Sequence, residues 1–233
     1  MRAVFFKELN HYFTSLTGYI YLSVQLLFCG IIFTSGNLLA QNSDIKTFFS
    51  SVFSILVFLI PLLTMRQFSE EKKMRTHQLL FTLPLSTEGI VMGKYLATLT
   101  VAAVGLAATL LYPLILGLYG SFQPLVTLGN YTGILLLLSA VIAVGLFVSS
   151  LNENQVISAI LSYAVIIFLW LADSLAPLLM GGRLNETINT FSLRKNYLEF
   201  TFGIFNPAAL LFYMLITLMF LFFTVVVLDS RRQ

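Results

Sequence analysis

Charge is scarce in this chain of 233 residues: Asp, Glu, Lys and Arg together make up only 10% of it, against 58% hydrophobic residues. A water-soluble globule of this composition would have far too little polar surface to cover its core. The mean hydropathy of +0.91 is that of an integral membrane protein. A span needs about 20 apolar residues, and six such spans leave only short loops, which excludes a soluble catalytic domain.

Cysteine and histidine are also nearly absent. Cys29 lies alone inside an apolar stretch, which excludes an intrachain disulfide framework and a cysteine-built zinc site. His11 and His77 fall in separate amphipathic segments, and nothing pairs them as a metal site. A phosphate loop is missing too, because Gly89-x-x-x-Gly93-Lys94 is too short and no Ser or Thr follows its lysine. We expect a chain that is not catalytic by itself and binds no cofactor or metal.

Six apolar stretches predict an all-α membrane protein with six transmembrane helices in a single domain, residues 1–233. The expected spans cover about 19–40, 48–64, 90–118, 128–150, 156–179 and 207–228. Pro61 and Pro113 should kink the second and third spans. Asn154 and Asn206 are expected N-caps of the fifth and sixth. Gly129-x-x-x-Gly133 in the fourth is a helix-packing signal.

Two further segments have the pattern of helices lying in the membrane interface. In residues 1–18 one helical face is apolar and the other is polar; the apolar face holds Phe5, Leu9, Tyr12, Phe13 and Leu16, and the polar face Lys7, His11 and Thr14. Residues 181–206 form the longest outer segment, with Leu193, Tyr197, Phe200 and Ile204 at helical spacing beside Arg194, Lys195 and Glu199. We expect an N-terminal amphipathic helix and an outer interfacial helix before the sixth span.

The longest strongly polar segment, residues 66–88, lies between the second and third spans. Its charges exclude a position at the bilayer centre, where each would cost about 3 kcal/mol or more. Apolar residues recur on one helical face and polar ones on another, with Phe68, Leu79, Leu80 and Leu83 opposite Glu70, Lys73 and His77. We expect a short cytoplasmic helix that ends at Pro84. Such a helix can take force from a soluble partner and pass it to both spans.

Lys and Arg are distributed unequally between the two sides of the membrane. With the N-terminus inside, the cytoplasmic set is Arg2, Lys7, Arg66, Lys72, Lys73, Arg75, Lys94, Arg231 and Arg232, and the outer set is Lys46, Arg183, Arg194 and Lys195. The positive-inside rule places both termini in the cytoplasm. Because these cations set topology, the pI near 9.0 indicates no nucleic-acid binding.

The polar segment also carries an ordered motif: Glu70-Glu71-Lys72, Thr76, Leu79-Leu80, Thr82, Pro84-Leu85-Ser86 and Gly93-Lys94-Tyr95-Leu96. This motif resembles the first cytoplasmic loop of ABC-2-type transporter permeases, the membrane subunits driven by separate ATPase subunits. The gliding-motility and copper-maturation branch is most similar, although its members usually have Gly and Glu where this chain has Arg75 and Gln78. The start of the chain, with Lys7, Glu8 and Phe13, is similar to the family's elbow helix, and the turn 145–155 to its second signature.

The resemblance implies a multi-pass subunit of a bacterial cytoplasmic membrane exporter. Two permeases, identical or related, would form a dimer surrounded by membrane lipids. ATPase subunits that bind ATP and Mg would dock on its cytoplasmic side, and a periplasmic accessory protein is a further possible partner. The implied coupling residues are Glu70, Glu71, Lys72, Lys73, Thr76, Gln78, Leu79, Leu80, Pro84, Asn152, Asn154 and Gln155. Glu70 and Glu71 would gain from the dipole at the start of the helix and from ion pairs with basic groups on the elbow or with Lys94.

The sequence leaves two alternative functions open. One is a force-transmitting scaffold of an envelope machine, for example in gliding motility, which moves no cargo. The other is a membrane-embedded enzyme, which needs several polar catalytic side chains at the same depth in the membrane. Asp173 has no acidic partner in another span, and both histidines lie in cytoplasmic segments. Few charges occur in the spans, so a pathway would be lined by Ser, Thr, Tyr and Phe, which favours an amphiphilic or lipid-linked cargo.

Overall fold

The computed structural model describes residues 1–42, 44–74, 86–119, 124–179 and 192–230, and within these ranges the chain is helical with no strand. The side chains of 119 and 172–179 are outside the description. The helices are α1 Arg2–Thr14, α2 Leu16–Phe33 with the π-helical turn Thr34–Leu39, α3 Ile45–Thr64, α4 Arg66–Lys73, α6 Thr87–Ala108, α7 Leu111–Tyr119, α8 Pro124–Leu151, α9 Gln155–Leu179, α11 Leu193–Thr201 and α12 Pro207–Ser230.

Five of the described helical stretches are long and apolar enough to cross a membrane: Leu16–Leu39, Ile45–Lys73, Thr87–Leu118, Pro124–Leu151 and Pro207–Ser230. A shorter apolar stretch, Gln155–Leu171, lies in α9. The prediction of an all-helical membrane protein is therefore confirmed, and the sixth span stays a prediction. α9 itself starts at the residue before the predicted one and ends at Leu179, as the sequence predicted.

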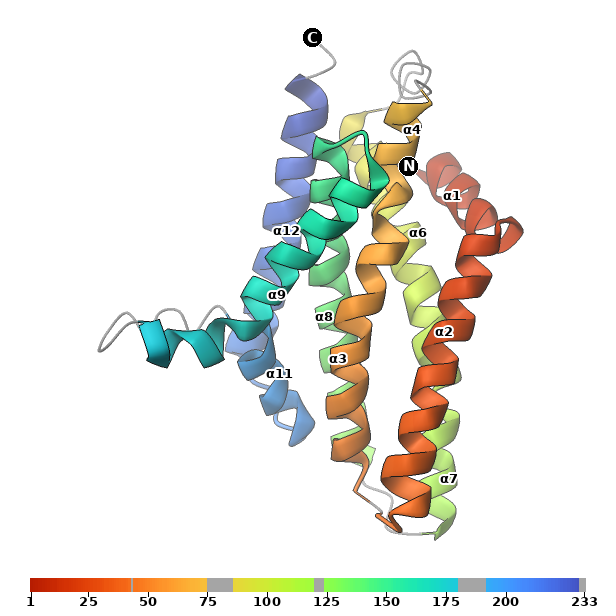
Figure 1. Ribbon diagram of the computed structural model, residues 1–233, viewed down its shortest axis with the longest axis vertical. Coiled ribbons are helices and arrows are strands. Elements are labelled where there is room, and N and C mark those ends of the chain that lie inside the picture. The colour runs from red at the N-terminus through yellow and green to blue at the C-terminus, as the bar shows by residue number, and fades with distance from the viewer. Residues whose placement is uncertain (43, 75–85, 120–123, 180–191, 231–233) are drawn as a thin grey trace.

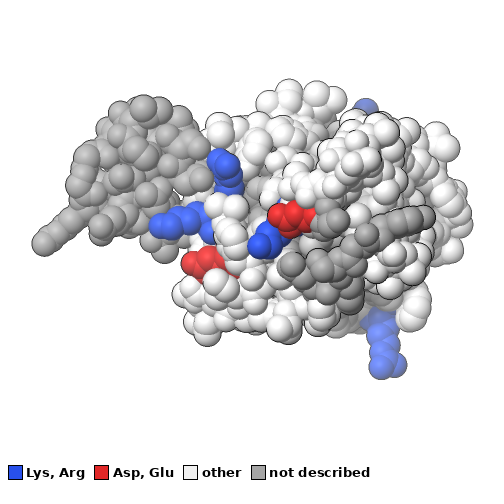
Figure 2. Space-filling model, turned by 90° about the horizontal axis from the view of Figure 1, so that it is seen from below, with Lys and Arg blue, Asp and Glu red and all other residues white. Residues whose placement is uncertain are grey.

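The spans form an elongated bundle with α4 and both termini at one end (Figure 1). α2, α3, α6, α8 and α12 run along its long axis, while α1 lies at the end that carries the termini and α4. The turn from α2 to α3 and helix α7 lie at the opposite end. Seen from that opposite end, most of the described surface carries no Lys, Arg, Asp or Glu, apart from a few such side chains near the middle of the face (Figure 2). α4 and both termini therefore lie at the same end of the bundle, and the side of the membrane on which they lie stays a prediction.

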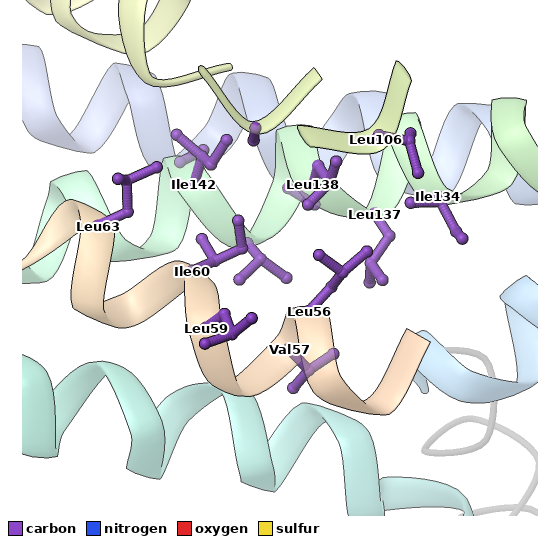
Figure 3. Close-up of a cluster of buried hydrophobic side chains, with 14 of the residues drawn as sticks. Leu56, Val57, Leu59, Ile60, Leu63, Leu106, Ile134, Leu137, Leu138 and Ile142 are labelled. Carbon is purple, nitrogen blue, oxygen red and sulfur yellow. The ribbon is translucent and has the colours of Figure 1, made fainter. Parts of the chain in front are cut away.

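α8 is the central helix, and it contacts α3, α4, α6, α9, α11 and α12. Figure 3 shows its apolar side chains meeting those of α3 and α6 in a layer without polar atoms. The residues of this layer include Leu56, Ile60 and Leu63 of α3, Leu106 of α6, and Ile134, Leu137, Leu138 and Ile142 of α8, all buried. Shape and close packing hold this layer together, because lipid tails are as apolar as the side chains themselves.

Of the two prolines predicted to kink spans, Pro113 lies next to a break in the helix, whereas Pro61 lies within a continuous α3. α6 ends at Ala108 and α7 begins at Leu111, so the break lies just before Pro113. Pro113 has no N–H for the carbonyl of Thr109, which instead accepts the N–H of Tyr112 at 3.0 Å. α3 continues through Pro61 and ends one turn later at Thr64, directly before α4. α4 is thus an extension of the second span.

The predicted N-caps are confirmed. Asn154 Oδ1 accepts the N–H of Val156 at 2.9 Å, and Asn206 Oδ1 accepts that of Ala208 at 2.9 Å. Each side chain satisfies one of the free N–H groups at a helix start.

The apolar face of the predicted outer helix contacts protein, where the sequence predicted contact with the membrane surface. α11 buries Leu193, Tyr197 and Phe200 against its neighbours, while Ile204 beyond its end is 59% exposed. The glycine pair of α8 explains this: a Cβ at Gly133 would lie 2.8 Å from Cβ of Phe200, and one at Gly129 would lie 2.8 Å from the Phe200 carbonyl oxygen. The Gly129-x-x-x-Gly133 packing signal is therefore confirmed.

Candidate functional site

A buried lysine joins three helices at the end that carries the termini. Lys94 of α6 is 1% exposed. Its Nζ lies 2.8 Å from Oε1 of Glu71 on α4 and 3.2 Å from Oε1 of Glu8 on α1. It also donates to the backbone carbonyl of Gln67 at 2.8 Å. An ammonium has three protons to donate, so all are used and α1, α4 and α6 are linked through one charge.

This group of charges, which we call the Lys94 cluster, consists of Lys94, Glu8, Glu71 and Lys7. Lys7 lies at its edge, with its side chain 63% exposed and its Nζ 3.7 Å from Glu8 and 3.8 Å from Glu71. The side chains of Glu8 and Glu71 are 9% and 17% exposed. Two lysines balance two glutamates, so the cluster is formally neutral. Neutrality reduces the high cost of burying these ions, and the many hydrogen bonds reduce it further.

Gly93 allows α1 to approach α6 closely enough for the cluster to form. A Cβ at this position would lie 2.9 Å from Cβ of Val4 and 3.3 Å from the carbonyl oxygen of Met1. α1 buries Val4, Glu8 and Tyr12, which recur every four residues and so form one face. The Gly93-Lys94 pair of the motif therefore has a structural reason: the glycine allows α1 to approach, and the lysine forms an ion pair with Glu8 of α1.

Tyr12 extends the linkage by hydrogen bonds. Its hydroxyl donates to the carbonyl of Leu63 at 3.2 Å and accepts a proton from the side-chain amide of Gln67. Thr98 Oγ1 lies 3.2 Å from the same hydroxyl and 3.1 Å from Gln67 Nε2. Burial raises the pKa of Tyr12 to about 12, and the hydrogen bonds with Thr98 and Gln67 offset part of that rise. The hydroxyl therefore stays protonated and acts as a structural link between α1, α3, α4 and α6.

A second polar network, which we call the serine network, connects α4 to the adjoining ends of α8 and α9. Ser69, Ser149 and Ser158 come from these three helices and are each fully buried. Ser69 Oγ lies 2.7 Å from Ser158 Oγ and 3.2 Å from Ser149 Oγ. Ser149 Oγ also donates to the carbonyl of Met65 at 3.0 Å, and Lys72 donates to the carbonyl of Ser150.

The predicted coupling residues divide into three groups. Glu71, Lys72, Lys7 and Glu8 make the contacts given above. Lys73 is exposed, Glu70, Asn152 and Gln155 are half-buried, Asn154 caps α9, and Phe13 is half-buried against the core. Thr76, Gln78, Leu79, Leu80 and Pro84 lie outside the described residues, as do most of the expected cytoplasmic helix and its end at Pro84.

One part of the prediction for Glu70 and Glu71 is wrong. α4 begins at Arg66 and has no acidic residue in its first turn, so both glutamates lie in its second half. The helix dipole there disfavours a negative charge. The predicted ion pairs with Lys94 and with a basic residue of the first helix, Lys7, are confirmed for Glu71, and they hold its carboxylate in place. Glu70 makes no ion pair with another described residue.

Sequence reasoning misses several members of the site. It places Tyr12 and Leu16 on one apolar face, yet Leu16 is 75% exposed and Tyr12 takes part in a polar network. The spacing of Val4, Glu8 and Tyr12 is the available signal for the buried face of α1. The serine network has no signal in the sequence, since isolated serines are common in membrane helices.

A cavity of about 490 Å³ adjoins the Lys94 cluster. α1 and α2 form one wall, and α3 and α4 form the other. Its lining is mostly apolar, with charged side chains at the end near the termini. No group of three His, Cys, Asp or Glu side chains suited to a metal ion occurs among the described residues.

These features define a class: a multi-pass helical membrane protein whose elbow-like first helix and polar segment are joined by buried charge at the end of the bundle that carries both termini. Comparison with known families identifies the class further. Residues 13–228 match the family model described as ABC-2 family transporter protein, and the chain belongs to that family. Its members are membrane components of transporters, not catalytic themselves, that work with ABC ATPase subunits. None of the curated proteins compared with the chain matches it.

The family match begins at residue 13, so most of α1 lies outside it. It identifies an ABC-2 permease and gives no support to the gliding-motility and copper-maturation branch.

Proposed function

We propose that this chain is the permease subunit of an ABC exporter in a bacterial cytoplasmic membrane. A separate ATPase subunit hydrolyses ATP, and the chain converts the resulting movement into export of a substrate. The observation that carries the proposal is the Lys94 cluster, because it connects the polar segment to two other helices through buried contacts.

The contacts give a physical route for that movement. A push on the segment 66–88 reaches α3 directly, since α4 continues that helix. It reaches α6 and α1 through Lys94, and α8 and α9 through the serine network. Packed helices linked in this way shift as a unit, which is how domain and subunit rotations propagate.

The proposed topology has six spans with both termini in the cytoplasm. Among described basic residues, Arg2, Lys7, Arg66, Lys72, Lys73 and Lys94 belong to helices near the termini, while Lys46, Arg194 and Lys195 belong to α3's first turn and α11. The positive-inside rule then makes the end with the termini cytoplasmic. α1 and α4 act as the elbow and coupling helices in this proposal, and a second permease copy or a related chain completes the transporter.

The test is to express the chain with the ATPase that copurifies with it and to reconstitute both in liposomes. We expect ATP turnover only in the complex, and release of an amphiphilic substrate on the far side. ATP hydrolysis by the rigorously purified chain, or failure to retain any ATPase under mild solubilisation, would refute the proposal. ATP turnover that responds to the permease while no cargo crosses would favour the force-transmitting scaffold.

A further inference from the structure

The cavity beside the Lys94 cluster has two chemically different parts. Its deeper walls are apolar and include Ile20 and Val24 of α2 and Leu59 and Leu62 of α3. Its rim toward the termini carries charged side chains, among them Arg66 and Glu70 of α4. The volume of about 490 Å³ falls in the range of roughly 300 to 1,000 Å³ that is typical of small-molecule sites. An apolar interior with a charged rim suits an amphiphile.

The position of the cavity points to the lipid bilayer as the source of that amphiphile. α2 and α3 both belong to stretches apolar enough to span a membrane. Ile20 and Leu62 line the cavity and are nevertheless 51% and 49% exposed, so its walls continue into the outer apolar surface of the bundle. The charged rim lies where the spans meet the polar segment, which is the level of lipid headgroups. A lipid can therefore place a chain between α2 and α3 and its headgroup against α4.

The charged side chains on the rim of the cavity indicate which class of lipid headgroup it can bind. The members of the Lys94 cluster also border the cavity, but they pair with one another. Arg66 and Glu70 are one helical turn apart on α4, and neither makes an ion pair with another described residue. Residues four apart on a helix have Cβ atoms about 6 Å apart. Opposite charges at that separation match a headgroup that holds a phosphate and an ammonium a short distance apart.

We propose that this cavity binds a phospholipid whose headgroup carries a phosphate and a primary ammonium. The guanidinium of Arg66 binds the phosphate with paired N–H donors, and the carboxylate of Glu70 accepts protons from the ammonium. One acyl chain lies between Ile20 and Val24 on one side and Leu59 and Leu62 on the other. A headgroup with net negative charge fits less well, because the carboxylate of Glu70, which makes no ion pair with another described residue, borders the cavity beside Arg66.

The experiment compares three lipids on the purified full chain. Native mass spectrometry counts the phospholipid retained when phosphatidylethanolamine, phosphatidylglycerol or phosphatidylcholine is added in equal amounts. We expect one tightly held phosphatidylethanolamine per chain. Arg66→Gln should lower its retention at least tenfold, and Glu70→Gln should abolish the preference for it over phosphatidylglycerol. Equal or stronger retention of phosphatidylglycerol by the wild type would overturn the proposal.

Matched variants separate binding at this site from general effects. Lys73→Gln removes a charge from the same helix at an exposed position, and it should leave retention unchanged. Val24→Phe fills the apolar part of the cavity and should reduce retention of all three lipids, whereas Val104→Phe adds the same bulk at a position that is 43% exposed on α6 and should not. A thermal unfolding midpoint within about 2 °C of the wild type shows that each variant is folded. Wild-type retention of lipid by Arg66→Gln, Glu70→Gln and Val24→Phe alike would refute the site.

A photoreactive side chain placed at position 62 identifies the occupant directly. Crosslinks to phospholipid in membranes support the proposal. Crosslinks only to another part of this chain or to a second copy mean that protein fills the cavity, which contradicts it. The assay contains no ATPase, so its result is independent of the function proposed above.

Discussion

Replacing Lys94 with methionine is the most informative perturbation of the buried cluster. The change keeps a long flexible side chain but removes the charge that lies between Glu8 and Glu71. At 2.8 and 3.2 Å, an effective dielectric constant of about 20 gives gross attractions of about 6 and 5 kcal/mol. Desolvation offsets most of this, and removing one partner of a buried pair costs about 3 to 5 kcal/mol. Because Lys7 stays near both glutamates, we expect a loss of about 2 to 3 kcal/mol.

Titration with sodium dodecyl sulfate, followed by the fluorescence of Trp170, measures the free energy of unfolding, since this chain has a single tryptophan. The control is a triple variant that combines Lys94→Met with Glu8→Gln and Glu71→Gln. It removes the stranded carboxylates together with their partner, so it should recover most of the lost stability. Lys94→Met with the stability of the wild type, or a triple variant less stable than Lys94→Met, would refute this view of the cluster.

Three further predictions follow from the contacts of α1 and from the distribution of charge. Gly93→Ala should destabilise the protein by about 1 to 3 kcal/mol, since the new methyl group meets α1, whereas Gly36→Ala should not, because no side chain or other helix among the described residues comes within 4 Å of the added methyl group. Equal free energies of unfolding for the two variants would contradict the close approach of α1 to α6. Tyr12→Phe should lower the free energy of unfolding by about 1 to 3 kcal/mol, because the side chains of Gln67 and Thr98 lose a hydrogen-bond partner. The pKa of Tyr12 in the folded protein is about 12 against its ordinary value of 10.0. Its contribution to the free energy of unfolding is therefore present below pH 10 and lost as the pH rises to 12. A Tyr12→Phe variant whose stability depends on pH as the wild type's does would argue against this contribution. Single cysteines on a cysteine-free background should be labelled from outside at position 46 and only from inside at position 73; labelling of position 73 in intact cells would refute the topology.

The spans could be predicted from sequence because long apolar runs depend on local composition. The expected second span begins at Phe48 and α3 begins at Ile45, and both end at Thr64. The caps at Asn154 and Asn206 are equally local. The kink before Pro113 follows from a missing N–H in the same chain segment, so it too needs no tertiary information.

The candidate site is less accessible to sequence reasoning because it depends on how helices cross. Glu71 and Lys94 could be paired in advance, since they are only 23 residues apart in the chain. The partnership of Lys94 with Glu8 requires knowing that α1 lies across Gly93, a contact between distant segments. The wrong prediction that the helix dipole stabilises Glu70 and Glu71 has a similar origin. α4 continues from α3 and starts at Arg66, whereas the run of charged residues alone suggests that the helix starts later. α11 lies against α8 because two glycines admit Phe200, and amphipathicity alone does not distinguish protein from lipid as the neighbour.

The central claim is that the Lys94 cluster passes movement of an ATPase to the spans. ATP turnover and substrate release in liposomes, measured for the wild type, Glu71→Gln and Glu88→Gln, test it most directly. Glu88 is an exposed glutamate in the first turn of α6, and it makes no ion pair with another described residue. We predict that all three proteins copurify with the ATPase, that Glu71→Gln lowers permease-dependent turnover and release at least fivefold, and that Glu88→Gln behaves as the wild type. Equal turnover and release for Glu71→Gln and the wild type would contradict the claim.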